Sequence, residues 1–238
     1  MNLYDSTSIS ISKQITRNYS TSFYFATSLL KKEKRDAIHS IYGFVRVADE
    51  IVDSFHDYDK EYLLNKFEDD YYEALKHNIS TNQILHSFQL AVKKYNISDE
   101  NVQSFLQSMK NDLKKTEYKT KSEIDEYIYG SADVVGLMCL NVFCDGDYKK
   151  IEKLEYPAMK LGSAFQKVNF LRDFKDDVES LDRKYFPNVD RHNFNEKAKS
   201  EIINEIENDF KEAYKGIKQL TSRSRLAVLL AYYYYNKL

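Results

Sequence analysis

Turn-forming residues are scarce in this chain. Only two prolines and six glycines occur in 238 residues, whereas a strand-rich domain of this size usually needs many more of them at its turns. No stretch alternates apolar and polar residues for long enough to predict a sheet. The sequence therefore predicts long helices, arranged in a single all-α domain over residues 1–238.

Cysteine, long apolar runs and a strong net charge are also lacking, and each absence argues against a class of protein. Cys139 and Cys144 do not form the CxxC spacing of a zinc or redox motif and are too few for a disulfide framework, so we expect reduced thiols in a cytoplasmic protein. The most apolar run, LAVLLAYYYY, is far shorter than the roughly 20 residues that span a bilayer. The N-terminus shows no secretory signal pattern, and the net charge of −2 does not suggest nucleic-acid binding.

Apolar residues recur every three or four positions along most of the chain, which is the period of an amphipathic helix. One such series is Ile38, Ile41, Val45, Ala48 and Val52. These patterns predict helices at about 32–55, 60–77, 81–95, 99–116, 122–145, 150–179, 196–220 and 222–237. The tract 180–195 lacks this period and contains Pro187, so we predict a long loop there, of a length that often serves as a lid.

Two of the predicted helices carry aspartates four residues apart. Asp49 and Asp53 lie in RVADEIVD, and Asp173 and Asp177 lie in NFLRDFKDDVE. On a helix, the members of each pair stand one turn apart on one face. The spacing alone is a weak signal, because twenty aspartates form only three such pairs, about as many as chance gives, and an ordinary solvated helix face would look the same. The third pair adds Asp57, which we interpret as a surface acid.

The surroundings of the two pairs favour a metal and diphosphate site. Apolar neighbours such as Val45 and Phe170 would draw both segments toward a core, where two like charges are costly unless a cation lies between them. Carboxylates suit Mg²⁺, which proteins commonly hold together with substrate phosphates. Arg46 and Arg172 lie within about one turn of the aspartates and would suit a diphosphate.

Five segments match, in order, the motifs of one enzyme family. They are YSTSFYFATSLL at 19–30, IYGFVRVADEIVD at 41–53, YIYGSADVVGLM at 127–138, GSAFQKVNFLRDFKDDVE at 162–179 and DRKYFP at 182–187. Through them the chain resembles the squalene/phytoene synthase family, the head-to-head (1′-1) prenyl synthases. The resemblance implies an all-α isoprenoid-synthase bundle with a central cavity. It also implies that the two aspartate motifs face each other across Mg²⁺, with Mn²⁺ as an alternative metal.

The resemblance further implies which residues do the chemistry. Two prenyl diphosphates would condense through a cyclopropyl diphosphate, and we expect two geranylgeranyl diphosphates to give phytoene, a step of carotenoid synthesis. The catalytic residues would be Asp49, Asp53, Asp173, Asp177 and Tyr127, and Asn169 would join the four aspartates as a metal ligand. The substrate-binding residues would be Ser20, Ser22, Phe23, Tyr42, Arg46, Ala132, Gly136, Leu161, Gln166, Arg172, Asp176, Arg183, Tyr185 and Tyr234.

Some of these residues have a structural interpretation as well, and the match departs from the family in two places. Gly136, like Gly130, would also permit close helix packing, Tyr127 would also suit a core, and Arg183 would suit a solvated loop. Glu50 stands where many relatives have a second adjacent aspartate. The chain also stops where relatives continue, so we expect the C-terminal helix to be short or missing.

Several alternatives stay open at this point. Within the family, a squalene or dehydrosqualene synthase would act on farnesyl diphosphate, and only squalene formation would need NADPH. A non-catalytic relative, acting as an assembly or binding protein, would share the fold, but such proteins typically lose the motif acids that are present here. A di-metal carboxylate bundle needs Glu-x-x-His pairs, and a cyclising terpene synthase needs a DDxxD motif; neither pattern reads cleanly in this chain.

The expected partners follow from this interpretation. They are prenyl diphosphate substrates, and nucleic acid is not among them. We expect a cytoplasmic monomer or weak dimer, and peripheral contact with the inner face of the membrane is an open alternative because the product is apolar.

Overall fold

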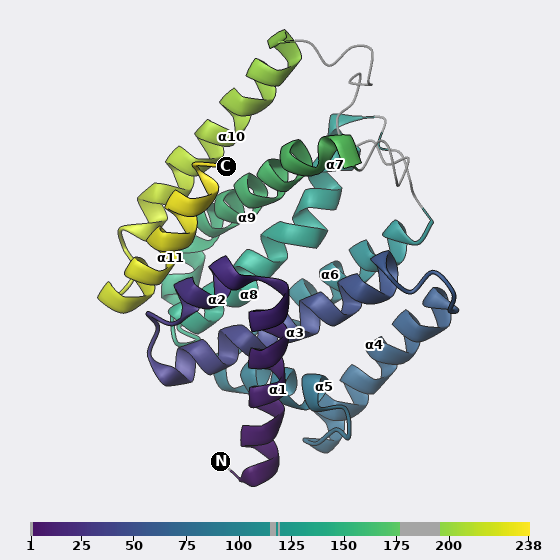
Figure 1. Cartoon of the computed structure of the whole chain (residues 1–238). Helices are drawn as coiled ribbons and strands as arrows, with labels where there is room; N and C mark the ends of the chain where they lie inside the picture. The colour runs from purple at the N-terminus through teal and green to yellow at the C-terminus, as the bar shows by residue number, and fades with distance from the viewer. Residues whose placement is uncertain (1, 115–117, 119, 177–195) are drawn as a thin grey trace.

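The computed structural model describes residues 2–114, 118, 120–176 and 196–238, and within these ranges it is helical without any strand (Figure 1). This confirms the predicted all-α class. In chain order the elements are α1 (Leu3–Tyr19), α2 (Thr21–Thr27), α3 (Lys32–Asp53), α4 (Lys60–His77), α5 (Gln83–Tyr95), α6 (Asp99–Asp112), α7 (Lys121–Ile128), the π-helical segment η1 (Tyr129–Asp133), α8 (Val134–Phe143), α9 (Tyr148–Asp176), α10 (Glu196–Ile217) and α11 (Ser222–Tyr235).

Every predicted helix has a counterpart in the structure. The predicted helix 60–77 coincides with α4, and most other boundaries differ by one to four residues. The predicted helix 122–145 is divided into α7, η1 and α8, because a π-helical turn adds a residue and changes the direction of the side chains that follow. The predicted loop 180–195 lies outside the described residues.

The helices α1 and α2 were not predicted, because α1 buries hydroxyl groups in place of apolar side chains. Ser8, Ser12 and Thr16, spaced four residues apart, are all buried, and an analysis of apolar periodicity does not detect them. At Gly43 of α3 a Cβ atom would lie 2.9 Å from the Ser12 hydroxyl, so α1 crosses α3 closely. The Ser12 hydroxyl also lies 2.7 Å from that of Ser87 on α5.

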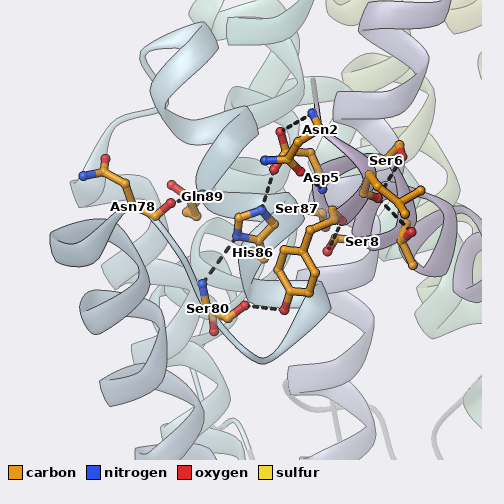
Figure 2. Close-up of polar contacts among 12 residues, drawn as sticks. Asn2, Asp5, Ser6, Ser8, Asn78, Ser80, His86, Ser87 and Gln89 are labelled. Atoms are coloured by element: carbon orange, nitrogen blue, oxygen red, sulfur yellow. Dashed lines mark hydrogen bonds and ion pairs between the residues drawn. The ribbon is translucent and has the colours of Figure 1, made fainter.

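The beginning of α1 is fixed to α5 by a buried histidine (Figure 2). His86 is 3% exposed, and its Nδ1 accepts the Ser80 backbone N–H at 3.4 Å. Its Nε2 therefore carries the hydrogen and donates to the Asp5 carboxylate at 2.9 Å. Tyr4 completes the contact, because its hydroxyl donates to the Ser80 carbonyl at 2.6 Å. These bonds hold α1 in place without a large apolar face.

The main core lies between α3, α4, α5 and α6 and is aromatic. Phe44 stacks on Phe88 with ring centroids 4.0 Å apart, and Tyr71 and Phe105 lie within 6 Å of Phe44. All four side chains are essentially unexposed. Burial of four such rings stabilises the bundle by several kcal/mol, at about 1.5–3 kcal/mol for each large apolar side chain. The core thus holds one face of α3 in place, and the other face carries charged residues such as Arg46 and Asp49.

Glycines bring α9 close to its neighbours. A Cβ at Gly136 of α8 would lie 2.9 Å from the Ala158 carbonyl oxygen of α9, and a Cβ at Gly162 of α9 would lie 2.7 Å from the Ala132 carbonyl oxygen. These contacts hold α9 against η1 and α8, while α10 runs beside α9 on the other side (Figure 1). No helix within the described ranges is long and apolar enough to cross a membrane.

Candidate active site

The first aspartate motif lies on α3, and Arg46 stands beside it. The Nη1 of Arg46 donates to the Oδ2 of Asp49 at 2.9 Å, and its Nη2 pairs with Glu50. The guanidinium lies over the ring of Tyr19, at 4.6 Å from the ring centroid. Its Nε is buried and has no hydrogen-bond partner among the described residues. Arg46 is thus held in place while one N–H remains for a ligand oxygen.

The two carboxylates of this motif repel one another. Burial, followed by the charge of Asp53, raises the pKa of Asp49 to about 7, although Arg46 acts in the opposite direction. Asp112, at the end of α6, raises the pKa of Asp49 further. Carboxylates that act on one another in this way suit a bound cation.

The described part of the second motif, on α9, also contains a side-chain oxygen without a partner among the described residues. The Oδ1 of Asn169 is buried and has no hydrogen-bond partner in the described structure, and an amide oxygen of this kind is a suitable metal ligand. Gln166, one turn earlier, is half-buried, and Arg172 is exposed. The amide oxygen on α9 and the carboxylates of Asp49 and Asp53 on α3 are each of a kind that binds a hard cation. That they bind one together stays a prediction.

The rest of the second motif is incompletely described. Asp173 and Asp176 lie in α9, but the description does not extend to their side chains. Asp177 and the predicted flap residues Arg183 and Tyr185 lie outside the described residues. Within the described ranges no group of three or more acidic, histidine or cysteine side chains forms a metal centre. The facing arrangement of the two motifs therefore stays a prediction.

Asp112 holds Tyr127 and was not identified from the sequence. The Tyr127 hydroxyl donates to Oδ2 of Asp112 at 2.9 Å, and the Tyr118 hydroxyl donates to Oδ1 at 2.9 Å. The Tyr127 ring stacks at 6.0 Å on Phe170 of α9. Since Asp112 also acts on the pKa of Asp49, this hydrogen-bonded group adjoins the first aspartate motif. A single aspartate at a helix end has no spacing pattern, so the sequence offered no signal for it.

The segment predicted to bind the first substrate packs against α3. Phe23 of α2 stacks on Tyr42, with ring centroids 5.3 Å apart. Burial raises the pKa of Tyr42 to about 12, and Ser20 and Arg46 are among the groups that act on it. Ser20 is the residue between α1 and α2, and Ser22 is half-buried. The structure thus brings this segment together with Arg46.

Two of the terminal tyrosines lie in different surroundings. Tyr234, the predicted substrate-binding residue, is 47% exposed and makes a ring contact with Tyr235. Tyr235 stacks on Phe165 of α9 at 4.1 Å and acts on the pKa of Tyr42. Because adjacent residues on a helix point in different directions, Tyr235 is a further candidate at this end of the site, and the role of Tyr234 stays a prediction.

The predicted cavity-wall residues lie on the two helical stretches that meet at the glycine contacts. Ala132 and Gly136 are half-buried on η1 and α8, and Leu161 packs in the apolar cluster of α9 that includes Val168 and Phe210. Gly136 also has the packing role anticipated for it, since any side chain there would meet the Ala158 carbonyl oxygen.

Known proteins are similar to this chain over most of its length. Residues 16–238 match the family model described as squalene/phytoene synthase. A chloroplastic phytoene synthase from an Oncidium hybrid cultivar is 30% identical over 94% of this chain and 58% of its own length. A 4,4′-diapophytoene synthase from Staphylococcus haemolyticus is 29% identical over 82% of this chain and 66% of its own length. The chain thus spans 58% to 66% of the length of these relatives.

Solved structures share the fold. A dehydrosqualene synthase crystallised with a ligand superposes with a TM-score of 0.87 at 22% identity, covering 98% of this chain and 85% of its own. A squalene synthase from Alicyclobacillus acidocaldarius superposes with a TM-score of 0.85 at 18% identity, covering 100% of this chain and 93% of its own. The observed bundle is therefore the helical isoprenoid-synthase fold, and the chain belongs to the squalene/phytoene synthase family.

Proposed function

We propose that this protein is a prenyltransferase that joins two prenyl diphosphates head to head (1′-1), with two geranylgeranyl diphosphates giving phytoene as the first candidate. The observation that carries the proposal is the arrangement around Asp49. Asp53 and Asp112 both disfavour the charged form of Asp49, which stands beside an arginine whose Nε has no hydrogen-bond partner among the described residues. Asp112 also holds the hydroxyl of Tyr127. Phytoene as product is supported by the similarity to a phytoene synthase over 94% of this chain.

A divalent metal fits this donor set. Asp49, Asp53 and Asn169, together with Asp173 and Asp177, would hold Mg²⁺, and Mn²⁺ would suit the same oxygens. When bound, the metal would neutralise the leaving diphosphate as it departs. Asp176 is proposed as a helper of this set.

The chain's own side chains have distinct proposed roles. Arg46 donates N–H groups to diphosphate oxygens, and Arg172, Arg183 and Tyr185 add to this clamp. Ser20, Ser22 and Phe23 position the first substrate, and Tyr42 and Gln166 bind beside them. Tyr127, held by Asp112, lies beside the reacting carbons. The apolar walls around Ala132, Gly136 and Leu161 exclude water from the allylic cation.

A second candidate is condensation of two farnesyl diphosphates to dehydrosqualene or squalene. The 29% identity to a 4,4′-diapophytoene synthase favours it. The fold and the motifs do not distinguish between the two substrate chain lengths. NADPH would be required only for squalene. Peripheral contact with a membrane and a monomeric or weakly dimeric state are proposals that accompany either product.

The test is product analysis with purified protein. Geranylgeranyl or farnesyl diphosphate is supplied with and without Mg²⁺ and NADPH, and both diphosphate release and the extracted lipid are measured. A C40 product that needs Mg²⁺ but not NADPH supports the first candidate, and a C30 product replaces it with the second. If neither substrate is turned over by folded protein, a non-catalytic assembly or binding role takes the place of both.

A further inference from the structure

A second cavity lies on the other side of α9 from the candidate active site. It has a volume of about 340 Å³ and lies between α7, η1, α9 and α10. Its lining from α9 is Lys160, Ser163 and Lys167, whereas the residues of α9 assigned to the active site are Leu161, Gln166 and Asn169. No predicted active-site residue whose side chain the structure describes lines this cavity. Its size is at the lower end of the range of cavities that bind small molecules, about 300–1,000 Å³.

The lysines of this cavity already have partners. Lys160 and Lys167 contact the two oxygens of Asp209 at 3.0 and 2.7 Å, and the Ser163 hydroxyl donates to Oδ2 of Asp209 at 3.1 Å. At the rim, Lys121 contacts Glu205 at 2.6 Å. A negatively charged ligand would therefore have to compete with carboxylates for every lysine that faces the cavity.

The polar group of this cavity that lacks a partner among the described residues is a hydrogen-bond acceptor. Asp133 is only 8% exposed, lines the cavity, and its Oδ1 has no hydrogen-bond partner among the described residues. A buried carboxyl oxygen without a donor is unfavourable by about 1–3 kcal/mol or more, and native structures rarely leave one without a role. Asp125 and Asn208 add two more oxygen-bearing side chains to the lining.

We propose that this cavity is a binding site for a small primary ammonium ion, with Asp133 as its anionic anchor and Asp125 at the rim. A primary ammonium group supplies both the positive charge and the N–H donors that Oδ1 of Asp133 lacks. The alkyl portion of such a ligand would lie against Ile128, an apolar residue of the lining.

The ionisation of Asp133 supports this assignment. Burial raises its pKa to about 7, Lys160 and Lys167 act in the opposite direction, and Asp209 adds to the increase. The other charged groups of the lining are Lys121 and Asp125 from α7 and Glu205 from α10. Alkylammonium ions stay charged well above neutral pH, so the pH dependence of their binding should follow the ionisation of Asp133. The affinity should fall by up to about tenfold for each pH unit below 7.

The site lies directly behind the wall of the active site. Asp133 follows Ala132 in the chain, and both belong to the η1 segment that contacts Gly162 of α9. π-helical turns are frequent at functional sites. A ligand bound to Asp133 would therefore contact the segment that carries a cavity-wall residue of the proposed synthase, although binding itself does not depend on that function.

The experiment is a titration of the full chain with n-butylammonium chloride, followed by isothermal calorimetry and by the thermal midpoint. Tetramethylammonium chloride serves as a control that has the charge but no N–H. Saturable binding of butylammonium, with little binding of tetramethylammonium, is expected. Binding should weaken at least about tenfold in Asp133→Asn and by a smaller factor in Asp125→Asn, a rim variant that leaves the buried network intact.

The matched control is Asp57→Asn, which removes an exposed aspartate outside the cavity and should bind like the wild type. The proposal is overturned if no saturable binding occurs, or if Asp133→Asn and Asp125→Asn both bind as tightly as the wild type. It is also overturned if inorganic phosphate binds saturably at the cavity while butylammonium does not. Neither readout uses prenyl diphosphates, so failure here is distinct from failure of the proposed synthase activity.

Discussion

Asp49 and Asp133 have similarly raised pKa values, about 7 in each case, but different surroundings. Burial is the main cause at both residues. Around Asp49 the next cause is a second carboxylate, Asp53, which adds to the increase. Around Asp133 the next cause is Lys160, which opposes it. The strongest electrostatic effect on the aspartate is therefore repulsive in the α3 region and attractive in the region between α9 and α10. This difference predicts how each region responds to substitution.

The largest effect is expected from removing the charge of Asp49 in the α3 region. Asp49→Asn should lower the rate of diphosphate release at least about a thousandfold, because a carboxylate proposed to hold the metal is lost. The thermal midpoint should stay the same or rise, since a repulsive contact is removed. Asp173→Asn should behave in the same way if the second motif completes the site.

Asp57→Asn is the control for this experiment. Asp57 is four residues from Asp53 but exposed, so its removal should leave turnover within about twofold of the wild type. Near-normal turnover by Asp49→Asn, measured at saturating Mg²⁺, would contradict the proposed metal site.

The second effect concerns the region between α9 and α10 and appears in stability. Asp209→Asn should lower the free energy of unfolding by about 3 kcal/mol, because Lys160 and Lys167 would lose a buried carboxylate between them. The measurement is urea unfolding near pH 7. Although burial acts in the opposite direction, the two lysines lower the pKa of Asp209. The wild type should therefore lose this contribution as the pH falls below about 4.

Asp70→Asn separates this network from ordinary surface pairs. Asp70 contacts the exposed Lys66 at 2.9 Å, and such a pair contributes at most about 1 kcal/mol. An equal loss of stability in Asp209→Asn and Asp70→Asn would show that the network at Asp209 is not special.

Features that recur along the chain at a regular spacing could be predicted from the sequence, whereas single residues could not. Apolar periodicity located α3 to α11 because their cores are built from side chains such as Phe44 and Phe88. It did not find α1, which buries Ser8, Ser12 and Thr16. The first aspartate motif was visible as a spacing, whereas Asp112 and Asp133 are single residues. Asp112 becomes significant only because folding brings Tyr127 to it. Asp133 becomes significant because its buried Oδ1 has no hydrogen-bond partner among the described residues.

A third effect tests burial alone, the cause that both regions share. Burial lowers the pKa of His39 to about 4, and the residue is unexposed. The folded protein keeps this histidine neutral, whereas the unfolded chain gains a proton below about pH 6.5. Stability should therefore fall by about 2 kcal/mol between pH 6.5 and 5, and His39→Leu should remove this part of the slope.

Ile38 provides the comparison for His39. Ile38→Leu changes a neighbouring side chain that is 2% exposed but cannot ionise, so the slope of unfolding free energy against pH should stay nearly as steep as in the wild type. If His39→Leu and the wild type keep the same slope, burial does not displace the ionisation of His39. The burial assigned to Asp49 and Asp133 would then need direct measurement by NMR titration.

The smallest effect joins Asp112 to the α3 region. Asp112→Asn keeps an oxygen and an amide near the hydroxyls of Tyr118 and Tyr127 but removes the charge that both hydroxyls contact. We expect kcat to fall about tenfold with little change in KM, because Asp112 positions Tyr127 and does not itself touch the diphosphates. Tyr127→Phe should cost a similar factor, and the double variant should cost little more than either single one. The positioning role of Asp112 is contradicted if the kcat losses of the two single variants multiply in the double variant, or if Asp112→Asn lowers only stability. Asp112 would then be a structural residue, and stacking on Phe170 would orient Tyr127.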